Sequence, residues 1–240
     1  MGDKNGKRGV VFLHFPKTAG TTYGTYLSKH CPGKGYGFAS WHAVGPKRLE
    51  APEGVLKGHM TFEQVSHLQG KSLFVTIMRH PLERSISLYQ HMRRVPGSAQ
   101  HEQAMSLSLD EYLHQGIAAN QYLMLLAGVP DWEADPPRLR QDPDPAARLD
   151  KALGRLSCFD HIGSIEDLGS SMTHLARLIG VAPPATIGRL NQGAHQRTDL
   201  IISADAVEAF EELAEADLRI YKRAMELRDL QYLTSRAARP

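Results

Sequence analysis

Short apolar runs recur along the chain and are separated by longer polar and amphipathic stretches. Val10–Phe15 is such an apolar run and is bounded by Gly and Pro, and the segments Gly54–Met60 and Ser72–Met78 are predicted as the second and third strands. Continuous apolar runs of this length are typical of strands buried on both faces of a parallel sheet. A further short run, Phe159–Ile165, predicts a late strand.

Segments with helical spacing follow these runs. Pro81 stands at the first turn of the helix predicted after Ser72–Met78, where its missing N–H costs nothing. Ser108 and Glu111 have the spacing of a capping box at the start of another helix. The pattern predicts helices over Thr21–Lys29, Pro81–Arg94, Ser108–Gln115 and Leu168–Ile179.

The C-terminal part predicts one long helix that starts near Ser203. It would carry Val207, Phe210, Leu213, Leu218 and Tyr221 inward. Strands that alternate with helices indicate an α/β fold, with a central parallel β-sheet flanked by helices in three layers.

We expect a single domain over residues 1–240, because a chain of 240 residues is long enough for one well-buried core. Residues 1–8 are expected to form a flexible N-terminus. The Pro- and Asp-rich segment 130–145 is expected to form a surface loop.

Composition narrows the functional classes only slightly. The net charge of +2 gives no reason to expect a nucleic-acid partner, and any basic surface must be local. No signal peptide is recognisable and no apolar run is long enough to span a bilayer, so the expected location is the cytoplasm. The two cysteines, Cys31 and Cys158, favour a reducing compartment.

The stretch "FLHFPKTAGTT" predicts an anion-binding loop between the first strand and the first helix. A helix that opens directly after such a turn presents unpaired backbone N–H groups and the positive end of its dipole to one point. Lys17 adds a full charge, Gly20 permits close backbone approach, and Thr21 and Thr22 offer hydroxyl donors. The alternative is a plain strand–turn–helix with a solvated Lys17.

A second motif, "RHPLERSISLY", follows the strand Ser72–Met78. Arg79 stands at the carboxyl end of that strand, where ligand residues collect in open parallel sheets, and Ser87 lies eight residues further on. Arg79 suits a phosphate and Ser87 can donate to the same group. For Arg84 a surface position is the expectation.

Together, the two motifs resemble those of sulfotransferases that use 3′-phosphoadenosine 5′-phosphosulfate (PAPS). The branch that they resemble is the carbohydrate type with the heparan and uronyl 2-O-sulfotransferases. This resemblance implies a P-loop-like fold, PAPS as sulfuryl donor, 3′-phosphoadenosine 5′-phosphate (PAP) as product, and no metal. Weaker similarity extends over Lys57–Phe62, Asn120–Gly128, Phe159–Leu168 and Arg189–Asn191, and to a closing helix with Tyr221.

The resemblance also assigns roles to residues. The loop residues Lys17, Thr18, Ala19, Gly20, Thr21 and Thr22 would hold the 5′-phosphosulfate, and Lys17 would neutralise the bridging oxygen as the sulfuryl group leaves. Arg79 and Ser87 would hold the 3′-phosphate. For the loop with Arg189, Asn191 and Arg197 two alternatives stay open: it closes over the nucleotide, or it is a solvated surface loop.

His59, in "GHMTF", matches the histidine that acts as general base in the 2-O-sulfotransferases. It follows a predicted strand, and histidine has a suitable unperturbed pKa. His14, His42 and a carboxylate remain the alternatives among a chain with 12 histidines. The resemblance implies that the acceptor is a hydroxyl group on a sugar or glycoside.

Two other functional classes compete with this interpretation. A P-loop kinase would place Lys and Ser or Thr directly after the glycine, whereas Lys17 precedes Gly20. A non-catalytic nucleotide-binding module would need no base beside Lys17, Arg79 and Ser87. The histidine spacings predict no metal site.

Overall fold

The computed structural model describes residues 8–33, 38–40, 48–50, 53–98, 100–128, 144–186 and 201–237. Several predictions fall on other residues and lie outside this described part. They concern the flexible N-terminus before Arg8, the surface loop up to residue 143, His42, and the loop with Arg189, Asn191 and Arg197.

A five-stranded sheet, parallel throughout, forms the centre of the fold, with strand order β2-β3-β1-β4-β5. The predicted α/β class with a central parallel sheet is confirmed. The strands are β1 (Val10–Leu13), β2 (Phe38–Ser40), β3 (Val55–His59), β4 (Leu73–Met78) and β5 (His161–Ser164). Of these, only β2 was not predicted.

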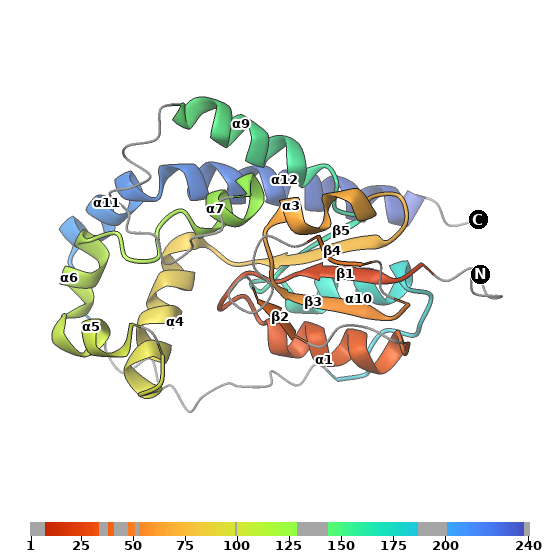
Figure 1. The fold of residues 1–240 in the computed structure, drawn as a ribbon, viewed down its shortest axis with the longest axis horizontal. Helices are drawn as coiled ribbons and strands as arrows, with labels where there is room; N and C mark the ends of the chain where they lie inside the picture. The colour runs from red at the N-terminus through yellow and green to blue at the C-terminus, as the bar shows by residue number, and fades with distance from the viewer. Residues whose placement is uncertain are drawn as a thin grey trace.

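Helices cover both faces of the sheet, which gives the predicted three layers (Figure 1). In the described residues, α1, α4, α6 and α10 coincide with predicted helices to within two residues at either end. The helices are α1 (Gly20–His30), α3 (Phe62–Val65), α4 (Pro81–Arg94), α5 (His101–Ser106), α6 (Leu109–His114), α7 (Gln121–Ala127), α9 (Pro145–Leu156), α10 (Leu168–Leu178), α11 (Ala204–Leu213) and α12 (Glu215–Ala237), with a 3-10 turn at Ser66–Leu68.

Alternate residues of the central strand β1 face opposite layers. Val10 and Phe12 pack with residues of α1 and α10, whereas Val11 and Leu13 pack with residues of α3, α7, α9 and α12. Both sets are buried, which explains why the strand reads as a continuous apolar run. A separate apolar cluster joins α4, α5, α6 and α11 beyond the carboxyl ends of the strands (Figure 1).

The prediction of one long C-terminal helix is wrong. Two helices, α11 and α12, meet at Ala214, whose backbone is not helical. Of the five residues predicted to face inward, Phe210 is buried and the others are only half-buried. Besides Phe210, most buried positions of these helices are small or polar, so a search for large apolar residues misses them. These buried residues are Ala206, Ala214, Asp217, Ile220, Ala224 and Tyr232.

Two buried histidines connect β5 to the helices beside it. His161 Nδ1 lies 2.8 Å from His174 Nδ1, and His161 Nε2 lies 3.2 Å from the Tyr23 hydroxyl of α1. The His174 ring stacks on Tyr232 of α12 at 4.3 Å. Because two ring nitrogens can share a hydrogen bond only if one lacks its proton, at least one of the two rings is neutral. This network ties α1, α10 and α12 to the same edge of the sheet.

The neutral state of His161 predicts a loss of stability in acid. Burial, and then the neighbouring His174, hold the pKa of His161 well below its ordinary value. The unfolded chain therefore takes up a proton near pH 6.5 that the folded chain does not bind. Each such histidine should remove about 1.4 kcal/mol of stability per pH unit below 6.5. Urea denaturation at pH 7.5, 6.5 and 5.5 should show a shallower loss for His161→Gln than for the wild type.

His114 provides a control of opposite sign. Hydrogen bonds with the Asp110 carbonyl and the Asp205 carboxylate raise the pKa of this exposed histidine. Its contribution to stability is present in acid and is lost as the pH rises through the folded-state pKa. His114→Gln should therefore steepen the acid loss. Identical slopes for the wild type and His161→Gln would contradict the assignment.

Candidate active site

Residues of the two sequence motifs meet at the carboxyl ends of three neighbouring strands. His14 and Lys17 follow β1, His59 is the last residue of β3, and Arg79 follows β4. The His14 N–H donates to the Gly58 carbonyl at 3.0 Å, so the parallel register carries the end of β1 directly beside the end of β3. This edge is where open parallel sheets bind ligands.

The loop between β1 and α1 has an uncommon backbone. Lys17 has φ 66° and Ala19 has φ 63°, both in the left-handed region that non-glycine residues rarely adopt. Ala19 is also the N-cap of α1, it supplies no side-chain cap, and the first turn of α1 carries no acidic residue. Left-handed turns of this kind direct successive N–H groups into one concavity, and the helix dipole adds positive potential there. The loop therefore has the chemistry of an anion site.

The threonines of the loop have different surroundings. The Thr18 hydroxyl is buried and donates to the Phe15 carbonyl at 2.8 Å, so it fixes the turn and leaves only the Thr18 backbone for a ligand. Thr22 is buried, whereas Thr21 is exposed at the start of α1. The sequence alone did not distinguish these roles.

Lys17 lies among other cations. Its pKa is lowered first by burial and then by the charges of Arg94 and Arg79. Arg79 is 23% exposed and its guanidinium lies 3.4 Å from the Glu83 carboxylate. Cations that lower one another's pKa in this way create a local positive potential, which favours an anionic ligand.

Helix α4 adds a polar stripe to this cationic group. Ser87, His91 and Arg94 are spaced four and three residues apart, so they share one face of the helix. Burial, and then the charges of Lys17 and Arg94, lower the pKa of His91, so this face of α4 lies within electrostatic reach of Lys17. Ser87 thus lies on the face of α4 that carries the neighbours of Lys17. His91 could have been found in the sequence because it lies four residues after Ser87, which places both residues on one face of a helix.

His59 and His14 are in direct contact. Their ring centroids are 4.6 Å apart, and His59 Nδ1 lies 2.7 Å from the His14 carbonyl oxygen. A carbonyl only accepts, so Nδ1 carries the proton and the neutral ring has its lone pair on Nε2. Burial lowers the pKa of His59, partly offset by this hydrogen bond. The neutral, proton-accepting form is therefore favoured at neutral pH.

The His14 ring explains why a glycine occupies position 20. A Cβ built on Gly20 would stand 1.7 Å from His14 Nε2, far inside van der Waals contact. The sequence assigned this glycine to the approach of a ligand, whereas in the structure the group that approaches it is the imidazole of His14. Burial and the nearby His59, Lys17 and Lys57 hold the pKa of His14 well below its usual value.

Arg84 is not at the surface, contrary to expectation. Its side chain is fully buried and donates to the Gln121 side chain and the Ala118 carbonyl. It lies 3.8 Å from the carboxylate of Asp217, which is also fully buried. The charge pattern missed this arginine because its partners come from segments that are distant in the sequence.

In the described part of the chain, no group of three or more His, Cys, Asp or Glu side chains could hold a metal ion. Likewise, no helix found there combines the length and apolar character needed to cross a membrane.

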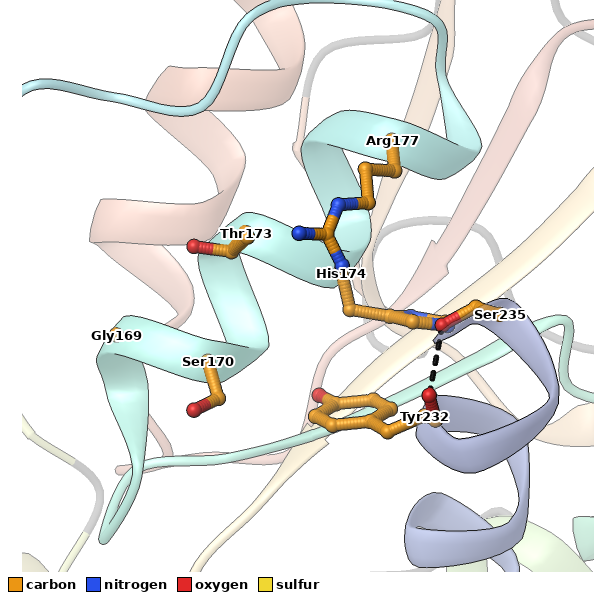
Figure 2. Close-up of a pocket in the computed structure, with 7 residues that line it drawn as sticks. All are labelled: Gly169, Ser170, Thr173, His174, Arg177, Tyr232 and Ser235. Atoms are coloured by element: carbon orange, nitrogen blue, oxygen red, sulfur yellow. Dashed lines mark hydrogen bonds between the residues drawn. The ribbon is translucent and has the colours of Figure 1, made fainter. Parts of the chain in front are cut away.

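A shallow pocket lies away from these motifs, between α10 and α12 (Figure 2). The rings of His174 and Tyr232 lie together in it, and the Ser235 hydroxyl donates to the Tyr232 carbonyl at 2.9 Å. None of the residues predicted for the donor or the base lines this pocket. Its lining residues are Gly169, Ser170, Thr173, His174, Arg177, Tyr232 and Ser235.

No family model matches this chain, and no curated protein matches it. Among solved structures, mouse sulfotransferase SULT7A1 complexed with PAP is similar with a TM-score of 0.44 and 11% identity, over 97% of this chain and 90% of that one. A sulfotransferase from Alicyclobacillus acidocaldarius has a TM-score of 0.48 and 13% identity, over 92% of this chain and 96% of that one. At this similarity, function has to be inferred from the residues of this chain.

The contact between Gly20 and His14 can be tested by a double-mutant cycle. Gly20→Ala alone should lower the free energy of unfolding by about 1–3 kcal/mol, because the added methyl group meets the imidazole. In a His14→Ala background the same change should be neutral or stabilising, since alanine is the better helix former. Chemical denaturation of the four proteins measures the coupling. Equal effects of Gly20→Ala in both backgrounds would show that the ring does not occupy this space.

Proposed function

We propose that this protein is a PAPS-dependent sulfotransferase that moves a sulfuryl group to a hydroxyl acceptor, on a sugar or glycoside. The observation that carries the proposal is the left-handed turn at Lys17 and Ala19, which opens α1 beside the charge of Arg79. A ligand for this arrangement needs one anionic group at the helix start and a second near Arg79. PAPS has a 5′-phosphosulfate and a 3′-phosphate that meet this requirement.

In this proposal the loop Lys17–Thr22 holds the 5′-phosphosulfate mainly through backbone N–H groups. Arg79 and Ser87 hold the 3′-phosphate, the group that separates PAPS from ATP-like donors. The order of Lys17 and Gly20 supports a sulfuryl donor over a nucleoside triphosphate, because the phosphate loops of kinases place the lysine after the glycine.

The transfer step assigns different tasks to Lys17 and His59. The acceptor oxygen forms a bond with sulfur while the bond from sulfur to the bridging oxygen of the donor breaks. Lys17 stabilises the negative charge that develops on the bridging oxygen. The acceptor proton passes to Nε2 of His59, whose Nδ1–H is held by the His14 carbonyl.

The donor assignment predicts that PAP binds much more tightly than AMP, which lacks the 3′-phosphate. A charge-assisted contact contributes about 1.5–3 kcal/mol, so the ratio of the two affinities should be roughly 10 to 150. Arg79→Ala should remove most of this ratio, with the remainder due to Ser87, while leaving AMP binding nearly unchanged. Isothermal titration calorimetry at fixed ionic strength measures both affinities.

Arg219→Ala is the matched control for this experiment. It removes one positive charge from an exposed position on α12, where Arg219 is 57% exposed. The PAP-to-AMP ratio should stay at its wild-type value in this variant. Equal binding of PAP and AMP by the wild type would refute the PAPS assignment. PAP selectivity without sulfuryl transfer from labelled PAPS to any of a panel of hydroxyl acceptors would favour a non-catalytic binding module.

For His59 the prediction concerns turnover. His59→Ala should keep its PAP affinity and lose about 10²–10⁴-fold in turnover, because the acceptor proton loses its base. The wild-type rate should rise with pH through a pKa below 6.5 and then level off, since burial depresses the His59 pKa. A coupled assay with labelled PAPS, followed from pH 5 to pH 8, measures both effects.

His67→Ala controls for the loss of a half-buried imidazole. His67 Nε2 also bonds a backbone carbonyl, that of Leu49 at 2.9 Å, but it lies between α3 and the amino end of β4, not at the carboxyl ends of the strands. Its removal should leave turnover unchanged. Near-normal turnover of His59→Ala would exclude His59 as the base, and His14 would be the next histidine to test.

A further inference from the structure

The hydroxyl of Tyr122 forms hydrogen bonds with both backbone polar groups of Arg79. It accepts a hydrogen bond from the Arg79 N–H at 3.1 Å and donates one to the Arg79 carbonyl at 2.6 Å. Two bonds to a single residue fix the orientation of both peptide planes that flank it. They therefore fix the direction in which the Arg79 side chain leaves the β4–α4 turn.

Tyr122 also touches the other half of the candidate site. Its ring is fully buried and packs edge-on against Phe15, with centroids 4.7 Å apart. Phe15 is the first residue of this turn, and its carbonyl accepts a hydrogen bond from the Thr18 hydroxyl. One side chain thus lies between the loop that follows β1 and the arginine that follows β4.

Buried charges hold Tyr122 in place. The Asp217 carboxylate of α12 accepts from the N–H groups of Tyr122 at 3.2 Å and Leu123 at 2.9 Å, so it caps the first turn of α7. The Arg84 guanidinium lies 3.8 Å from this carboxylate and 5.3 Å from the centre of the Tyr122 ring. A cap supplied by another helix, with a buried counter-charge, anchors the start of α7 firmly.

We propose that Tyr122 is a positioning residue for the 3′-phosphate of the donor, held by Asp217 and Arg84, and that it acts by aiming Arg79. This inference rests on the proposed function. It goes beyond the two sequence motifs, because neither contains Tyr122 or Asp217. The packing of Tyr122 against Phe15 needs only its ring, whereas the hydrogen bonds to the Arg79 backbone need its hydroxyl.

Tyr122→Phe separates these two roles, because it keeps the ring and removes the hydroxyl. The ratio of PAP to AMP affinities should fall about five- to tenfold, as expected when an arginine loses its orientation but not its charge. AMP affinity should stay within about twofold of the wild type. Binding is measured by calorimetry well below the unfolding temperature, so a change in stability alone does not move the ratio.

Tyr232→Phe is the matched control. Tyr232 is also buried, and its hydroxyl also bonds a backbone carbonyl, that of Ile162 at 3.2 Å. Tyr232→Phe removes a comparable group that bonds β5 and not Arg79, so its PAP-to-AMP ratio should equal that of the wild type. Asp217→Asn should lower the ratio as well, because an amide offers only one oxygen to the two N–H groups of α7.

The decisive comparison uses Arg79→Ala as background. If Tyr122 acts through Arg79, adding Tyr122→Phe to Arg79→Ala should cause no further change in the ratio. A Tyr122→Phe variant with the full wild-type ratio, while Arg79→Ala has lost it, would overturn the positioning role and leave the donor assignment standing. A wild type that does not distinguish PAP from AMP would instead overturn the proposed function.

Discussion

The left-handed backbone at Lys17 and Ala19 is the constraint on which the candidate site depends. Each such residue costs on the order of 1–3 kcal/mol and persists only where its surroundings determine the conformation. Here the surroundings do so from several sides. The Thr18 hydroxyl closes the turn onto Phe15, the Ala19 carbonyl accepts the first bond of α1 from Tyr23, and the His14 ring covers Gly20. The strain in the loop is thus supported by the β-sheet and by α1 together.

Much of the fold could be predicted because its signals are local. The strands β1 and β4 lie in largely apolar runs, and Pro81 and the Ser108–Glu111 capping box mark the starts of α4 and α6. The break between α11 and α12 could not be predicted in this way. Its buried positions include Asp217, which binds the start of α7, and Ala206 and Ala214, which pack with residues of α4 and α6. Their burial depends on these distant partners and not on their own hydrophobicity.

In the candidate site, too, the features with local signals could be predicted and those that depend on long-range contacts could not. The residue types of the loop, Arg79 and His59 were readable, since each stands at or directly after the end of a segment that could be predicted as a strand. The contact between His14 and His59 was not, because it depends on the register of β1 against β3. Arg84 shows the limit most clearly: a charged residue in an amphipathic helix reads as solvated, yet its partners Gln121 and Asp217 come from distant segments.

The cap of α7 by Asp217 has a consequence for how the molecule assembles. The bond from the Tyr122 N–H to Asp217 spans 95 residues, and that from Leu123 spans 94. Contacts over such separations must close a large chain loop before they repay its entropy, so they form slowly compared with local helices. A ribosome that has released only β1 to α7 has released both sequence motifs without the carboxylate that holds Tyr122. The geometry around Arg79 is therefore completed only after the C-terminal helix has been synthesised and has docked.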